Sequence, residues 1–200
     1  MREELVPLAM PREQVTPATE VRSTLITAAL GALKGANLLD AYCAKLPPGW
    51  REKMLALPTG IWVPIEYGDV HYRTGEALDL APHEILALGN AVERNAEKTI
   101  FAFVLRTARE AGTTPATVIA STPRMWARCF KGGCVAAYKV GPKDAVFETI
   151  GVPMARYRYF RTGYRAVVTS LLAPFCTKVI CKELPRLTTD SAFAVSIAWA

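Results

Sequence analysis

The chain has 200 residues, of which 51% are apolar and 21% charged, and it carries a formal net charge of +6. This length is enough to bury one sizeable core, and the composition excludes a disordered, proline-rich polar protein. The modest positive charge is compatible with acidic partners but does not define a nucleic-acid binder, so we predict no nucleic-acid partner.

The apolar stretches are too short for a membrane-spanning protein. The two longest, 24–33 and 166–175, have about half of the roughly 20 residues that a spanning helix needs. The first residues are mixed in charge and no apolar signal core follows them. We therefore predict a cytoplasmic protein without a membrane span. Five cysteines, an odd number, favour reduced thiols over a disulfide framework.

The amino-terminal half is predicted to be helical after a loosely held start. Residues 1–21 are expected to form a flexible amino-terminal arm, because their three prolines prevent a long helix. Apolar residues then recur at helical spacing over 23–34, and a glycine follows as a stop. Further helices are expected over 37–46, which a Pro-Pro-Gly run ends, and over 50–57.

The middle of the chain continues this pattern. Residues 61–65 are β-branched and aromatic but contain Pro64, which predicts an edge strand or an extended connection. A long helical region is expected from Pro82 to Gly112, with a polar middle. Another is expected over 115–131, interrupted by a proline and ended by two glycines.

The carboxyl half has a different character. It contains four β-rich runs in two pairs, at 134–140 with 145–150 and at 176–184 with 191–199. Between the pairs, 154–173 has apolar residues on one helical face. This order predicts an α+β fold, with an amino-terminal helical bundle packed on a four-stranded antiparallel sheet built from two hairpins flanking one helix. Residues 22–200 are predicted to form a single domain.

This order of elements resembles the ligand-binding fold shared by haem nitric-oxide-binding domains, four-vinyl-reductase-type domains and Bet3-like vesicle-tethering subunits. At residue level the chain resembles an uncharacterised paralogous family of about this length found in myxobacteria. That resemblance rests on Leu88-Gly89 and its following helix, the helix over Tyr157 to Tyr164, and the closing strand over Ala194 to Trp199. The resemblance implies a pocket between helices and sheet for haem, a fatty acyl chain or another mostly apolar ligand.

The haem-binding branch of this fold uses a proximal histidine on a helix and a Tyr-x-Ser-x-Arg signature for the propionates. The corresponding run here is Tyr157-Arg158-Tyr159-Phe160-Arg161, with tyrosine in place of the serine. The two histidines are His71, in a predicted loop, and His83, in the first turn of the long helix. Neither lies midway along a helix shortly before the first hairpin. We therefore predict that the chain carries no cofactor.

Metal binding and catalysis lack a matching motif. Cys129 with Cys134 and Cys176 with Cys181 are each five residues apart, and residues five apart on a strand point to opposite faces. Buried apolar thiols are therefore the favoured interpretation, and no metal site is predicted. No glycine-rich phosphate loop, nucleophile elbow or zinc-protease histidine pair is present, so no catalytic residue is nominated.

Two groups of residues are candidates for ligand binding. Arg158, Arg161 and Arg165 lie at i, i+3 and i+7 of a predicted helix, so they form one basic stripe that suits carboxylates or phosphates. A solvated face that pairs with nearby acids is the alternative. The candidate pocket wall is aromatic and consists of Trp126, Phe130, Tyr138, Phe147, Tyr164 and Trp199, and Tyr157 is a further candidate for ligand binding. Aromatic residues at regular positions are also, and more often, part of an ordinary core.

Two functions remain open at this point. The first is a noncatalytic ligand-binding or sensory and regulatory domain, with a mostly apolar pocket for an apolar or anionic small molecule. The second is a protein–protein interaction module, expected to be a homodimer, in which side chains fill the pocket. In that alternative the helices or the arginine stripe contact a protein partner.

Overall fold

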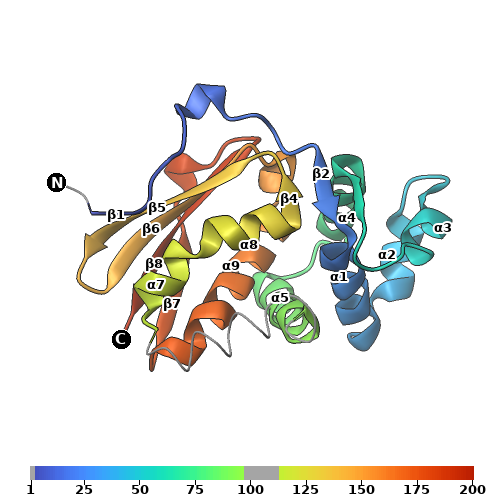
Figure 1. Cartoon of the computed structure of the whole chain (residues 1–200). Helices are drawn as coiled ribbons and strands as arrows, with labels where there is room; N and C mark the ends of the chain where they lie inside the picture. The colour runs from blue at the N-terminus through green and yellow to red at the C-terminus, as the bar shows by residue number, and fades with distance from the viewer. Residues whose placement is uncertain (1–2, 97–112) are drawn as a thin grey trace.

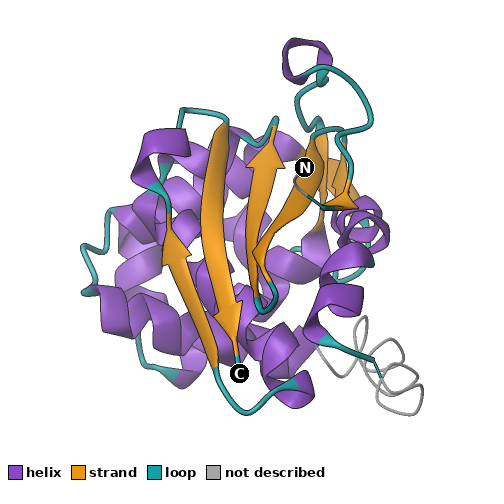
Figure 2. Cartoon of the chain, turned by 90° about the vertical axis from the view of Figure 1, so that its left-hand side faces the viewer, coloured by secondary structure: helices purple, strands orange, loops and turns teal. Residues whose placement is uncertain are grey.

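The computed structural model describes residues 3–96 and 113–200 of the chain. They form an α+β fold in which helices cover one face of a five-stranded antiparallel sheet (Figure 1, Figure 2). The predicted fold class is confirmed. Within these two ranges, no helix combines the length and apolar character needed to cross a membrane.

Both predicted hairpins lie in the larger sheet. Its strands are β1 (Glu4–Val6), β5 (Cys134–Gly141), β6 (Asp144–Ile150), β7 (Val179–Glu183) and β8 (Ala192–Trp199). They are ordered β1-β5-β6-β8-β7. The first hairpin is β5 with β6, the second is β7 with β8, and the two hairpins are joined by pairing of β6 with β8. On β8, Phe193, Val195 and Ile197 are almost completely buried, because alternate residues of a strand point to the same face. That face carries the helices.

The amino-terminal segment, predicted as a flexible arm, contributes a strand to each sheet. Glu4–Val6 forms a fifth strand on the edge of the sheet, next to β5. Further along, β2 (Glu20–Arg22) is the central strand of a three-stranded sheet with β3 (Trp62–Pro64) and β4 (Phe130–Lys131). The prolines prevent a long helix but lie outside β1 and β2, where they remove no ladder donor. The prediction of an edge strand around Pro64 is confirmed, since β3 is an edge of the smaller sheet.

Helices make up most of the remaining described chain. They are α1 (Ser23–Gly35), α2 (Leu39–Lys45), α3 (Trp50–Leu55), α4 (Ile65–Glu76), α5 (Pro82–Ala96), α7 (Pro115–Ala120), α8 (Thr122–Cys129) and α9 (Arg158–Leu172). Of these, α4 was not predicted from the sequence. The helix α9 begins four residues later than expected, because Pro153–Arg156 forms a 3-10 turn. The predicted continuation of α5 over 97–112 lies outside the described residues.

The core lies where α9 packs on the inner face of the sheet. Phe160 and Tyr164 of α9 meet Phe193 of β8 edge-on, with ring centroids 5.7 and 5.3 Å apart. Edge-to-face ring pairs of this kind are favourable beyond the apolar area that they bury. On its other side α9 contacts α5, and α5 contacts α1 (Figure 1). The helices thus form a layer beside the sheet, with α9 between the sheet and the amino-terminal helices.

Candidate functional site

A mostly apolar cavity of about 150 Å³ lies between the helices and the inner face of the larger sheet. Side chains of α1, α4, α5, α7, α8 and α9 form most of its wall, and β4, β6 and β8 contribute one residue each. The ring-bearing residues of the wall are His71, Tyr72, Trp126, Phe130, Phe147, Tyr159, Phe160 and Tyr164. The cavity therefore lies at the junction of the helical layer and the sheet.

Two glycines shape the wall where α5 crosses α9. A Cβ atom added at Gly89 would lie 2.6 Å from the Cβ of Ala166 and 2.8 Å from the carbonyl oxygen of Gly163. Only glycine therefore permits this close approach of the two helices. Gly163 is different, because a Cβ added there would have no other atom of the described residues within 4 Å. Both glycines line the cavity, so Gly89 sets the helix spacing while Gly163 leaves space unfilled.

Ring contacts hold the aromatic part of the wall in place. Tyr72 of α4 meets Phe160 of α9 edge-on, with centroids 4.7 Å apart. On the opposite side, Trp126 and Phe130 stack at 4.3 Å, and the indole Nε1 of Trp126 donates to the carbonyl oxygen of Gly132 at 3.1 Å. The wall is therefore held by contacts between different elements, which fixes its side chains before any ligand enters.

His71 is the polar residue of greatest interest in the wall. It was expected in a loop, but it lies in α4 and is 0% exposed. Its Nδ1 is 2.9 Å from Oη of Tyr42, and its Nε2 has no hydrogen-bond partner among the described residues. Burial lowers the pKa of His71 to about 4, so the imidazole is neutral at physiological pH. The sequence does contain a signal for the start of α4, because Pro64 precedes this helix and Glu66 lies in its first turn.

The other titratable groups of the wall are also neutral. Burial raises the pKa of Tyr159 to about 12 and that of the Cys129 thiol to about 12. The pKa values of Tyr72 and Tyr164 are likewise raised by burial. A neutral, mostly apolar wall suits an uncharged ligand and offers neither an ionised nucleophile nor a charged general acid. Within 3–96 and 113–200, no three histidine, cysteine or acidic side chains gather to hold a metal ion.

The structure brings together some of the predicted aromatic residues. Trp126, Phe130, Phe147 and Tyr164 line the cavity, whereas Trp199 is not among its described lining residues. Tyr138 does not, because its neighbour Ala137 pairs with the cavity-lining Phe147 and adjacent strand residues point to opposite faces. Tyr157 lies just before α9 and donates its hydroxyl hydrogen to Oδ1 of Asp69 at 3.1 Å.

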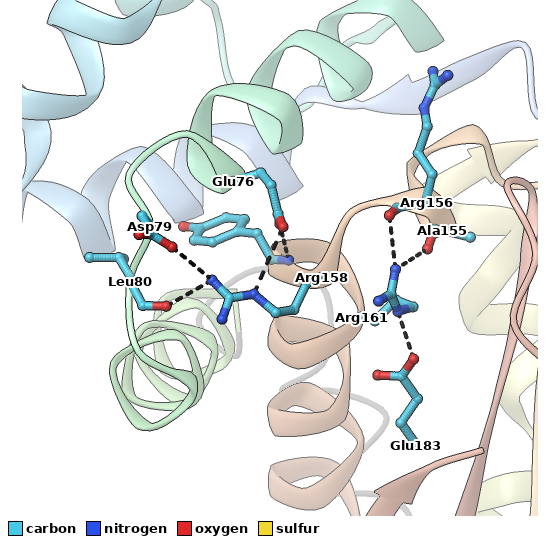
Figure 3. A network of polar contacts seen from close by, with 9 residues as sticks. Glu76, Asp79, Leu80, Ala155, Arg156, Arg158, Arg161 and Glu183 are labelled. Carbon is cyan, nitrogen blue, oxygen red and sulfur yellow. Dashed lines mark hydrogen bonds and ion pairs between the residues drawn. The ribbon is translucent and has the colours of Figure 1, made fainter. Parts of the chain in front are cut away.

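The predicted arginine stripe does not reach the cavity either. Arg158 donates from Nη2 to the carbonyl oxygen of Leu80 at 3.1 Å and lies 3.8 Å from Glu76 and 3.6 Å from Asp79 (Figure 3). These contacts join α9 to the end of α4 and to the connection before α5. The guanidinium therefore has carboxylate partners within the chain, as the alternative of a paired helix face predicted.

Arg161 and Arg165 point towards β7 rather than into the cavity. Arg161 donates from Nε to Oε1 of Glu183 at 2.7 Å, and from Nη1 to the carbonyl oxygens of Ala155 and Arg156 at 2.8 and 2.9 Å (Figure 3). Arg165 donates from Nη2 to a β7 carbonyl oxygen at 3.1 Å. These two side chains therefore fasten α9 to the sheet, and their binding of a ligand stays a prediction.

Replacing Arg161 with methionine is expected to lower the free energy of unfolding by about 2 kcal/mol, because Glu183 and two carbonyl oxygens lose their donors in a largely buried place. Urea denaturation measures the change. Arg158→Met is the matched control, since the Arg158 side chain is 39% exposed against 16% for Arg161. Its loss should be less than half as large. Equal losses would contradict the fastening role of Arg161.

Comparison with known proteins shows that this architecture is similar to solved structures but gives no sequence match. No protein-family model matches the sequence, and no curated protein matches it. Solved structures do match. The Fe(II) unliganded H-NOX protein from K. algicida has a TM-score of 0.64 at 9% identity, over 90% of this chain and 96% of that one. An oxygen-binding H-NOX domain related to soluble guanylate cyclases, solved as its oxygen complex, has a TM-score of 0.56 at 11% identity, over 89% and 94%.

These values show a shared fold. The predicted resemblance to the fold of haem nitric-oxide-binding domains is thus confirmed at the level of architecture. The resemblance to a myxobacterial family receives no support from these comparisons. At such low identity, the fold does not transfer a ligand or an activity to this chain.

Proposed function

We propose that the chain is a noncatalytic ligand-binding domain with a sensory or regulatory role, whose ligand occupies the cavity between the helices and the larger sheet. The observation that carries this proposal is the mostly apolar cavity of about 150 Å³ with a neutral wall. The cavity is bounded by both the helices and the sheet, so a ligand inside it would contact both layers. Binding could then shift the population of one packing arrangement over another, as a sensor requires.

The size of the cavity limits the ligand. In another protein, an engineered cavity of about 150 Å³ lined by aliphatic and aromatic side chains stays free of water and binds benzene. A ligand of roughly that size, with little polar surface, fits this cavity by the same reasoning. The prediction of an anionic ligand is not favoured here, because the three arginines of α9 are engaged with groups of the chain itself.

Haem is the group that the fold suggests, and the described residues do not fit it. A porphyrin macrocycle is several times larger than benzene, whereas the cavity has about the volume that benzene needs. The propionates of a haem need cationic partners, yet within 3–96 and 113–200 no arginine or lysine lines the cavity. We therefore propose a small ligand without haem.

The test uses benzene as the probe and two matched glycine variants. Isothermal calorimetry should detect benzene binding to the wild-type chain and lose it in Gly163→Leu, whose side chain would occupy the cavity. Gly35→Leu is the control, because a Cβ at Gly35, at the exposed end of α1, also has no atom within 4 Å. It should bind benzene as the wild type does. Absence of benzene binding to the wild type, or unchanged binding in Gly163→Leu, would overturn the proposal.

Native mass spectrometry of freshly purified protein adds a second reading. A mass excess that disappears on denaturation would identify a copurifying ligand and support the proposal. A ligand-free mass at twice the chain mass, together with no benzene binding, would instead support the homodimeric interaction module. The predicted homodimer and cytoplasmic location stay predictions.

A further inference from the structure

We propose that His71 selects the ligand through a hydrogen bond from its Nε2–H to one acceptor atom on an otherwise apolar molecule. This inference rests on the proposed function, because it names the class of ligand that the cavity would hold. The ligand class is thus a compact, uncharged molecule with a single accepting oxygen or nitrogen, such as a small ketone, an ether or an aromatic nitrogen heterocycle.

Nε2 of His71 is a buried nitrogen without a hydrogen-bond partner among the described residues. Buried polar atoms in folded proteins almost always have a hydrogen-bond partner, and an exception calls for an explanation. Among the described residues, the buried side-chain atoms without a partner belong to three residues, and His71 is the one of these that lines the cavity. The nitrogen exposes almost none of its surface as the ring stands, so a polar atom of a ligand would supply the missing partner once the imidazole turns towards the cavity. The rest of the wall, being mostly apolar, would contact the body of the ligand.

The contact between His71 and Tyr42 indicates which nitrogen of the imidazole carries the proton. The hydroxyl of Tyr42 is buried, and its hydrogen bond among the described residues is the one with Nδ1 of His71. If Tyr42 donates to Nδ1, the proton of the neutral imidazole is on Nε2, and this N–H is the single unmatched donor. If Nδ1 donates to Tyr42 instead, both the tyrosine hydroxyl hydrogen and Nε2 lack partners. The first arrangement leaves fewer buried groups unpaired and is therefore favoured.

The Nε2–H of His71 should favour ligands that carry an acceptor atom. An acceptor that meets this N–H gains a hydrogen bond in a buried place, whereas a purely apolar ligand leaves the N–H unpaired. A ligand with only a donor hydrogen gains nothing from the Nε2–H. A net hydrogen bond of this kind corresponds to a change of about tenfold in affinity. The pocket should thus distinguish molecules of equal shape by the position of one acceptor.

The experiment compares benzene, pyridine and pyrrole above neutral pH, where pyridine is unprotonated. Benzene and pyridine have nearly the same shape, but pyridine accepts a hydrogen bond, whereas pyrrole donates one. The variant is His71→Leu combined with Tyr42→Phe, because removing both partners leaves no unpaired group behind. In calorimetry, the variant should lose about tenfold in affinity for pyridine relative to benzene, and pyrrole should follow benzene.

The outcomes separate this inference from the proposed function. If benzene and pyridine both fail to bind the wild type, the cavity is no binding site and both proposals fall. If both bind and the pyridine-to-benzene ratio is the same in the variant, the role of His71 is wrong while the ligand-binding function stands. Should the variant not fold, nitrogen-15 spectra of the histidine ring in the wild type decide the matter. Pyridine, and not benzene, should shift a protonated Nε2 signal, and an unprotonated Nε2 would overturn the inference.

Discussion

Acidification from pH 6.5 to pH 4 is expected to lower the free energy of unfolding by about 3 kcal/mol through the shifted pKa of His71. Burial lowers the pKa of His71 from 6.5 to about 4 in the folded chain, so the unfolded chain binds a proton more readily in this range. The contribution is therefore fully present above pH 6.5 and is lost as the pH falls towards 4. Denaturant unfolding at a series of pH values measures it.

The control for this pH dependence is the double variant that combines His71→Leu with Tyr42→Phe. All other side chains are the same in both proteins, so the difference between the two curves isolates His71. The rings that face His71 belong to Tyr42, Tyr72 and Tyr159. Burial raises the pKa of each, so they stay neutral throughout. Parallel curves for wild type and variant would show that His71 is not buried as a neutral group.

The carboxyl half was the most predictable part of the fold. Two pairs of β-rich runs around turn residues specify hairpins locally, and the 3–4 spacing from Phe160 to Leu171 specifies the apolar face of α9. The edge strand β1 was not predictable in the same way. Its pairing with β5 joins residues more than 130 positions apart, such as Glu4 and Tyr138, and nothing in its three residues encodes that partner.

The candidate site was predicted only in part, for a related reason. Trp126, Phe130 and Tyr164 were found because regular helical and strand spacing points them inward. The same spacing rule placed the three arginines on one stripe but could not reveal that their partners come from other elements. Only the fold brings a carboxylate or a carbonyl oxygen to each guanidinium. Arginines on an amphipathic helix are therefore ambiguous between ligand binding and internal anchoring.

His71 was missed because the helix that carries it was missed. Pro64 was given weight as a strand feature, and it does end β3, but it also stands at the N-cap of α4. One residue thus has two roles, a strand end and a helix start, which is typical of a tight strand-to-helix junction. A histidine assigned to a loop is expected to be solvated. In the structure His71 lies in α4, where it is a buried polar residue in the wall of the cavity.

Replacing Gly89 with valine is expected to lower the free energy of unfolding by about 3 kcal/mol, because its Cβ would collide with backbone that cannot rotate away. The nearest atoms are the Cβ of Ala166 and the carbonyl oxygen of Gly163, at 2.6 and 2.8 Å, so α5 must move away from α9. That movement would widen one wall of the cavity and weaken benzene binding. Urea denaturation and benzene calorimetry measure the two effects.

The facing glycine provides the matched control for Gly89→Val. A Cβ at Gly163 meets no atom of the described chain within 4 Å, so Gly163→Ala should raise stability by about 0.5–1 kcal/mol through the higher helix propensity of alanine. Opposite signs at two glycines on one helix crossing would show that Gly89 alone is required for close approach. If both substitutions were neutral, the tight contact between α5 and α9 would not be what positions the cavity wall. The aromatic contact between α4 and α9 would then be the feature that positions the wall.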